Sequence, residues 1–351
     1  MYPNIFHGPR IQRPVGAALI LGALLAVTAA SPRAHASSDD AQKCEQASGI
    51  TAIAACTRAI ESSQYHGHEL AELHNNRAIE YRVTRDYDSS IADFTTAIRL
   101  DPQFAFAFFG RANTWQAKGD NDRAIADFSE AIRLSPDYLN AYNNRGTAWL
   151  AKEDYDRAIA DFSAVIRLDP KDPDGFSNRG AALKLNGDPR RAIGDFNEAI
   201  RLNPDDACAF YNRALAWEDT GARDRAIADY SEAIRIAPNY AAALNNRGVV
   251  WQEKSDNDRA IADFTAAIRI NRRAPVFFFN RGNAWSDKGD QDRAIDDYSE
   301  ALRLKPGYAD ALYLRGVAKQ QNGDKAGGAT DIAAATKLDP NAGHARKRAS
   351  R

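Results

Sequence analysis

The chain has 351 residues, of which 46 are Lys or Arg and 47 are Asp or Glu, so its formal net charge is −1. It lacks the positive excess that drives binding to nucleic acid or to anionic membranes, which excludes these as its main partners. Gly and Pro recur so evenly along the chain that internal repeats must be sought before domains.

Residues 1–36 have the composition of a secretory signal peptide. Arg10 and Arg13 precede an apolar run over residues 15–30, and an Ala-His-Ala sequence typical of cleavage sites ends at Ala36. The apolar run of about 16 residues is shorter than the roughly 20 that a membrane-spanning helix needs. We expect cleavage after Ala36, a periplasmic or secreted mature protein, and no stable membrane insertion. An uncleaved anchor is the alternative.

Residues 37–70 predict a degenerate helical hairpin followed by a linker. Residues 53–60 are similar in sequence to residues 91–98, and Cys56 occupies the position of Phe94 in that later segment. Terminal units of repeat arrays are atypical because one of their faces meets solvent, so we interpret this hairpin as the cap of an array.

The cysteines add a second feature to this cap. Cys44 and Cys56 are twelve residues apart, so two antiparallel helices joined by a short turn would bring them within disulfide reach. An exported protein meets an oxidising environment, and we therefore expect a disulfide between them. Two free buried thiols are the alternative. Cys208 is left without a partner.

The remainder of the chain is built on a period of 34 residues. Apolar residues recur at helical spacing twice in each period, with turn residues such as Gly119 and Asp120 between the two runs. Each period therefore predicts a helix, a turn and a second helix. The eight expected repeats are 71–104, 105–138, 139–172, 173–206, 207–240, 241–274, 275–308 and 309–342. Residues 343–351 are expected to form a basic disordered tail.

The residues of the second repeat carry a family pattern. Positions 4, 8, 11, 20, 24, 27 and 32 of this repeat hold Phe108, Ala112, Trp115, Ala124, Phe128, Ala131 and Pro136. This pattern resembles the tetratricopeptide repeat. The resemblance implies an all-α fold, an α-solenoid formed by a right-handed superhelix of eight helix-turn-helix repeats. It also implies that the first helices line a concave groove that binds a protein or peptide segment.

Aromatic and small residues recur at packing positions of this pattern. The five tryptophans all fall at position 11, and an aromatic residue occupies position 24 in seven repeats. We expect both sets to lie in the core. Position 8 is Ala or Gly throughout, because two helices must approach each other closely there.

Two charged positions depart from the family pattern. Position 7 is Arg in every repeat, from Arg77 to Arg315, and position 23 is Asp in every repeat, from Asp93 to Asp331. An unpaired charge beside the core is costly, so we expect each Arg to bond an Asp in its own or an adjacent repeat. A ring of Arg side chains that reaches an acidic ligand is the alternative.

Position 6 of the repeats is mostly Asn. A row of Asn side chains on the groove, each with donors and acceptors, is able to hold the backbone of an extended peptide. Bonds from these Asn residues to neighbouring helices are the alternative, and the sequence favours neither. The candidate residues at this position are Asn144, Asn178, Asn212, Asn246 and Asn280.

Aromatic residues at positions 2 and 5 distinguish some repeats from the others. Apolar side chains exposed on a concave face often mark interaction sites, so we expect them to anchor a partner. Packing between neighbouring first helices is the alternative. These candidates are Phe106, Phe109, Tyr211, Phe279 and Tyr313.

The sequence contains no phosphate-binding loop, no H-E-x-x-H, no G-x-S-x-G and no C-x-x-C motif. We expect no catalytic residue, no cofactor and no metal site. The sequence predicts a protein-interaction scaffold whose partner is a protein or peptide. A periplasmic ligand-binding or enzyme-regulating subunit is the alternative.

Overall fold

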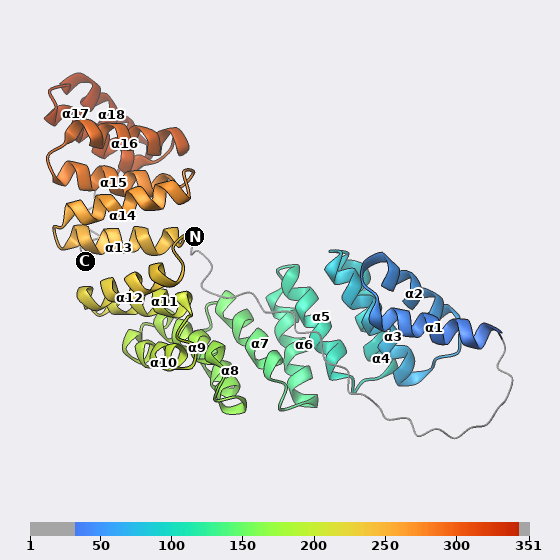
Figure 1. Cartoon of the computed structure of the whole chain (residues 1–351). Helices are drawn as coiled ribbons and strands as arrows, with labels where there is room; N and C mark the ends of the chain where they lie inside the picture. The colour runs from blue at the N-terminus through green and yellow to red at the C-terminus, as the bar shows by residue number, and fades with distance from the viewer. Residues whose placement is uncertain (1–31, 344–351) are drawn as a thin grey trace. The chain divides into compact units, whose positions relative to one another are not determined.

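A computed structural model describes residues 32–343, and over this range the chain consists of eighteen α-helices joined by short turns (Figure 1). The described residues divide into two compact units. We call residues 32–187 the N-terminal unit and residues 188–343 the C-terminal unit. The division falls inside the repeat 173–206, between its two helices.

The helices of both units follow the 34-residue period. The N-terminal unit contains α1 (Pro32–Gln46), α2 (Gly49–Glu61), α3 (Gly67–Val83), α4 (Tyr87–Leu100), α5 (Ala105–Ala117), α6 (Asn121–Leu134), α7 (Leu139–Ala151), α8 (Tyr155–Leu168) and α9 (Pro173–Leu185). The C-terminal unit contains α10 (Pro189–Leu202), α11 (Ala207–Asp219), α12 (Arg223–Ile236), α13 (Ala241–Glu253), α14 (Asn257–Ile270), α15 (Pro275–Asp287), α16 (Gln291–Leu304), α17 (Ala309–Gln321) and α18 (Lys325–Leu338).

Within each unit, every helix packs on the next helix of the chain. The first helices of adjacent repeats also contact one another, as α3 does with α5 and α13 does with α15. Helices of 13 or 14 residues are marginally stable alone, so this stacking supplies most of their stability. The expected all-α array of helix-turn-helix repeats is confirmed.

The turn inside each repeat depends on a left-handed residue at position 15. Five repeats have Gly there, which adopts positive φ without a steric penalty. Arg85, Glu153 and Ser255 adopt the same conformation, at φ 64°, 60° and 63°. The next residue is Asp in seven repeats, and it caps the second helix: Asp120 accepts a bond of 3.0 Å from the N–H of Arg123.

The core of each repeat is built around the ring at position 24. These seven aromatic side chains are 0 or 1% exposed. The small residue at position 8 lies directly against this ring, since a Cβ added to Gly146 would be 2.8 Å from Phe162. The same addition at Gly248 would be 2.7 Å from Phe264. Both expectations, a buried aromatic and a close helix approach, are confirmed.

The tryptophans at position 11 are half-buried, and so lie less deep than the core placement that we expected. An Arg at position 19 of the same repeat covers each indole ring. The guanidinium of Arg123 lies 3.6 Å from the ring centre of Trp115, and that of Arg293 lies 3.8 Å from the ring centre of Trp285. The cation–π contact lets the ring stay close to the surface.

Helices α1 and α2 form the hairpin that the sequence predicts before the first repeat. Cys44 and Cys56 are both buried, and their sulfur atoms lie at the disulfide distance of 2.04 Å. Helix α3 begins at Gly67, one turn earlier than the repeat boundary at residue 71. The added turn is stabilised because Leu70 packs on the cysteines with Leu73.

The two ends of the chain bound what the structure describes. Residues 1–31, which hold most of the expected signal peptide, lie outside the described residues, as does the tail from residue 344. Helix α1 spans the expected cleavage position after Ala36. Among the described helices, none combines the length and the apolar character needed to cross a bilayer.

Candidate functional site

The ten candidate binding residues lie on the first helices of the repeats, but their exposure differs widely. Phe106 is the exposed member of the set, with half of its surface accessible. Asn144, Tyr211 and Asn212 are buried, at 8%, 6% and 5% exposure. The half-buried members are Phe109, Asn178, Asn246, Phe279, Asn280 and Tyr313.

Four of the five candidate Asn side chains at position 6 bond to the preceding repeat. Asn178 donates to the side-chain oxygen of Asn143 at 2.8 Å, and Asn280 donates to that of Asn245 at 2.9 Å. Asn144 and Asn246 make the equivalent bonds to Asn113 and to the hydroxyl of Tyr211. These four amides therefore connect neighbouring helices, as in the alternative, and one donor of each of the four is already occupied.

The aromatic residues at position 5 pack inside their own repeats. Phe109 lies between the buried ring of Phe128 and the ring of Tyr138, with centroid distances of 5.7 and 4.8 Å. Tyr211 and Phe279 repeat this arrangement with the rings at positions 24 and 34 of their repeats. This packing explains why they are less exposed than Phe106.

Phe106 belongs to a row of rings along the first turns of adjacent repeats. Its ring contacts Phe104 and Tyr138 edge to face, with centroid distances of 6.3 and 5.3 Å. His68, in the first turn of α3, continues the row at 5.0 Å from Phe104. We call these four residues the aromatic row. Sequence reasoning missed three of its members, because Phe104 and Tyr138 lie at position 34 and His68 was expected in a linker.

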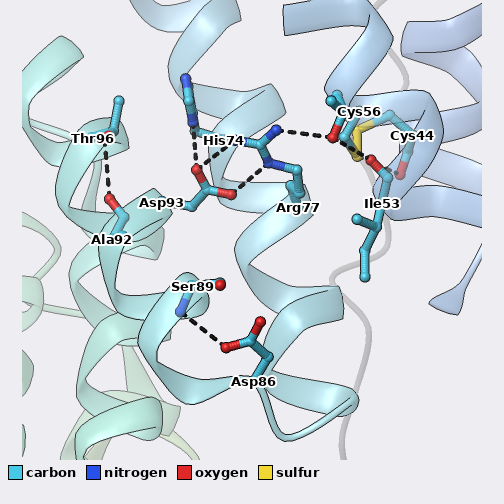
Figure 2. A network of polar contacts seen from close by, with 11 residues as sticks. Cys44, Ile53, Cys56, His74, Arg77, Asp86, Ser89, Ala92, Asp93 and Thr96 are labelled. Carbon is cyan, nitrogen blue, oxygen red and sulfur yellow. Dashed lines mark hydrogen bonds and ion pairs between the residues drawn. A yellow bond between two sulfur atoms is a disulfide. The ribbon is translucent and has the colours of Figure 1, made fainter. Parts of the chain in front are cut away.

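A ladder of guanidinium groups runs through both units beside the core. In seven repeats, the Arg at position 7 donates two parallel bonds to the Asp at position 23. Figure 2 shows the first rung, in which Asp93 accepts from Arg77 at 2.6 and 2.8 Å and from His74 at 2.8 Å. The expected pairs observed within the units are Arg77–Asp93, Arg111–Asp127, Arg145–Asp161, Arg213–Asp229, Arg247–Asp263, Arg281–Asp297 and Arg315–Asp331.

The third guanidinium nitrogen of each rung reaches the preceding repeat. Arg145 Nη1 donates to Ser129 Oγ at 2.9 Å, and Arg77 Nη1 donates to Thr57 Oγ1, on α2 of the terminal hairpin, at the same distance. Ser, Thr or Asn accepts this bond in all eight repeats. Each Arg therefore joins two repeats, and this contact was not predicted.

The electrostatics of the ladder differ between rungs. Burial opposes ionisation of Asp93, but bonds from Arg77 and His74 together outweigh it and lower its pKa. At Asp297, burial dominates over the Arg281 bonds, with the nearby carboxylates adding to it, and the pKa is raised. A second donor beside the carboxylate therefore accompanies a lowered pKa, and Lys319 takes this place at Asp331 in the last rung, where the pKa is lowered as well.

Chemically reactive groups are sparse in the described part of the chain. Cys208 is half-buried, and burial raises the pKa of its thiol. Within residues 32–343, no group of three His, Cys, Asp or Glu residues has an arrangement that could hold a metal ion. Two open depressions of about 510 and 470 Å³ lie at the turns inside repeats, lined mainly by Lys, Asp and Asn side chains.

Comparison with known families supports the pattern identified in the sequence. A family model described as "Tetratricopeptide repeat" matches residues 75–138, 110–173 and 180–241. A second model, described as "TPR repeat", matches residues 286–323. Together the two models match more than half of the chain. No curated protein matches it.

Solved structures of helical repeat proteins resemble the chain in fold. A tetratricopeptide repeat protein from Parabacteroides merdae has a TM-score of 0.56 at 15% identity, over 76% of this chain and 98% of that one. PilF of Pseudomonas aeruginosa has a TM-score of 0.52 at 17% identity, over 61% and 97%. The APC/C hetero-tetramer Cut9–Hcn1 has a TM-score of 0.52 at 18% identity, over 92% and 64%. At these identities, the likeness concerns the fold.

Proposed function

Because this chain belongs to the tetratricopeptide-repeat family, we propose that it is an exported scaffold whose first helices bind a segment of a partner protein. The role is one of binding without catalysis. It follows from the architecture, since stacked repeats present a long surface and leave the side chains between them engaged in packing.

The observation that carries this proposal is the exposure of Phe106. Its side chain is 50% exposed at position 2 of α5. The charged and amide side chains at positions 6 and 7 bond internally, as Asn144 and Arg145 do. A large exposed aromatic residue, on a surface whose polar side chains are satisfied, favours contact with another protein.

Export is part of the proposal. The leader-like composition of residues 1–36 supports it, as does the disulfide distance between Cys44 and Cys56, since disulfides persist in oxidising compartments. Fractionation of producing cells should place the protein in the periplasm or medium. N-terminal sequencing should then begin at Ser37; a start at Met1 in the membrane fraction would contradict cleavage.

The binding role is tested by capture with matched proteins. The chain from Ser37 onward, tagged at its C-terminus, is compared with the variant Phe106→Ala on an envelope extract. We expect at least one protein to be recovered several-fold less by the variant, with both proteins melting at the same temperature. Equal recovery by both would contradict the proposed face. Saturable uptake of a small molecule, with no protein captured, would instead support a ligand-binding subunit.

A further inference from the structure

The aromatic row is assembled from three separate segments of the N-terminal unit. His68 comes from the first turn of α3, Phe104 and Phe106 flank the start of α5, and Tyr138 precedes α7. Successive ring planes are turned by 66°, 67° and 61°. Phe106 contacts the rings on both sides and still keeps half of its surface exposed. The row is therefore preformed and open to an occupant.

Carboxylates flank this row. Asp101 Oδ2 lies 2.5 Å from Nδ1 of His68, and Glu72 Oε1 lies 3.4 Å from its Nε2. The side chain of Glu72 is 56% exposed and occupies position 2 of its repeat, on α3, as Phe106 does in the next repeat.

The charge of the surrounding segments has one sign. Residues 67–74, 101–106 and 135–140 contain four carboxylates and no Lys or Arg. The guanidinium groups of Arg77 and Arg111, on the same helices, are engaged by Asp93 and Asp127. A cation placed on the row would therefore meet exposed aromatic surface and negative charge, with no Lys or Arg of these segments competing for the carboxylates.

We propose that the aromatic row binds Arg or Lys side chains of an extended segment of the partner, with the cation against Phe106 and its charge balanced by Glu72 and Asp101. This inference rests on the proposed function and names the chemistry of its partner. Ring faces attract cations, and guanidinium groups are the more frequent occupants. The protein uses the same contact internally, where Arg123 covers Trp115.

Other occupants fit less well. A purely apolar segment would remove the exposed carboxylate of Glu72 from water without supplying a new bond, which is unfavourable. A phosphate-bearing ligand would be repelled by the same carboxylates.

The C-terminal unit provides a matched control at the same repeat position. Val276 is 40% exposed at position 2 of α15, but the loop before it contains Arg272 and Arg273, both exposed. Position 34 before this helix is Ala274 rather than an aromatic residue. Val276→Ala therefore removes an exposed apolar side chain from a basic surface, whereas Phe106→Ala removes one from an acidic surface.

The test mixes the chain from Ser37 onward with a fluorescently labelled peptide, Gly-Ser-Arg-Ser-Arg-Ser-Gly. Binding of the peptide is measured by fluorescence anisotropy at low and high salt. We expect saturable binding that weakens with salt and falls about tenfold in Phe106→Ala and in Glu72→Gln. Binding should be unchanged in Val276→Ala. A peptide with citrulline in place of Arg should bind about tenfold more weakly, because it lacks the charge.

Equal affinity of the citrulline peptide, or of Phe106→Ala, would overturn the cation proposal. If partner capture depends on Phe106 while the Arg peptide binds no protein, this inference fails and the proposed function stands. A variant that ends at Gly343 lacks the basic residues Arg346, Lys347, Arg348 and Arg351. Tighter peptide binding by this variant would show that the chain's own tail occupies the row, and would overturn the proposal of a separate partner. Unchanged binding supports the proposal.

Discussion

Arg145 and Asp161 form a bidentate pair in which Nε donates to Oδ2 at 2.9 Å and Nη2 donates to Oδ1 at 2.7 Å. Both side chains are largely shielded from water, with 20% and 7% exposure. The remaining donor of Arg145 reaches Ser129 in the preceding repeat. One side chain thus connects three helices: α6, α7 and α8.

Loss of this guanidinium should be severely destabilising. Arg145→Leu leaves the buried carboxylate of Asp161 unpaired, which we expect to cost about 3–5 kcal/mol in urea unfolding followed by circular dichroism. Arg133→Leu is the control, because Arg133 bonds Glu130 on the exposed surface and its loss should cost much less. Replacing both Arg145 and Asp161 by Leu should recover much of the loss. Equal effects of the two single variants would contradict a buried pair.

The left-handed residue Glu153 stores strain that glycine would relieve. Its φ of 60° costs a non-glycine residue about 1–2 kcal/mol, while glycine loses about 0.5–1 kcal/mol through chain entropy. We expect Glu153→Gly to stabilise the protein by about 0.5–1 kcal/mol, seen as a higher melting temperature. Glu153→Ala should bring no such gain, because Ala also carries a Cβ. A stabilisation by Ala equal to that by Gly would show that loss of charge is the cause.

The disulfide should stabilise the terminal hairpin. A closed loop of this length contributes about 3 kcal/mol in the chain-entropy model, so the double variant Cys44→Ser and Cys56→Ser should lose about that much. Alkylation of the unfolded, unreduced protein should modify only Cys208, and alkylation after reduction should modify all three cysteines. Mass spectrometry distinguishes these results. Three modified cysteines before reduction would show that the bond does not form.

The first rung should influence acid stability. The pKa of Asp93 is lowered in the folded protein, so its contribution is present above the unfolded value of about 3.9 and is lost as pH falls through the folded value. His74→Phe removes one bond to this carboxylate and should raise its folded pKa. The acid-unfolding midpoint should then move to higher pH, as measured by circular dichroism. The control His66→Ala changes an exposed residue and should leave the acid-unfolding midpoint unchanged. An equal shift of the midpoint in both variants would show that the effect does not arise from the bond between His74 and Asp93.

Much of the fold was predictable because local chemistry repeats with the period. Turn residues such as Gly119 and Asp120 mark each helix boundary, and the small residue at position 8 follows from the ring that it meets. The Arg–Asp pairs were predictable because both residues recur in every repeat beside the core, where an unpaired charge would destabilise the fold. The bond to the preceding repeat was missed, although position 25 is Ser, Thr or Asn in the first seven repeats.

The candidate site was less predictable, because exposure depends on contacts between positions distant in the repeat. Phe109 and Phe106 both look like surface anchors in the sequence. Tyr138 covers Phe109 and contacts only part of Phe106. The place of His68 depended on a helix that starts one turn earlier than its repeat boundary, at Gly67.

Ala333 occupies position 25 of the last repeat, where the first seven repeats have a residue that accepts from the next Arg. No guanidinium follows it in the 34-residue register, so no hydroxyl is required. The same bond therefore joins each repeat to the next, so the repeats are interchangeable at this contact. A longer protein is obtainable by inserting a whole internal repeat ahead of residue 309. A module appended after Ala342 would need Ala333→Ser first, to supply the oxygen for its incoming arginine.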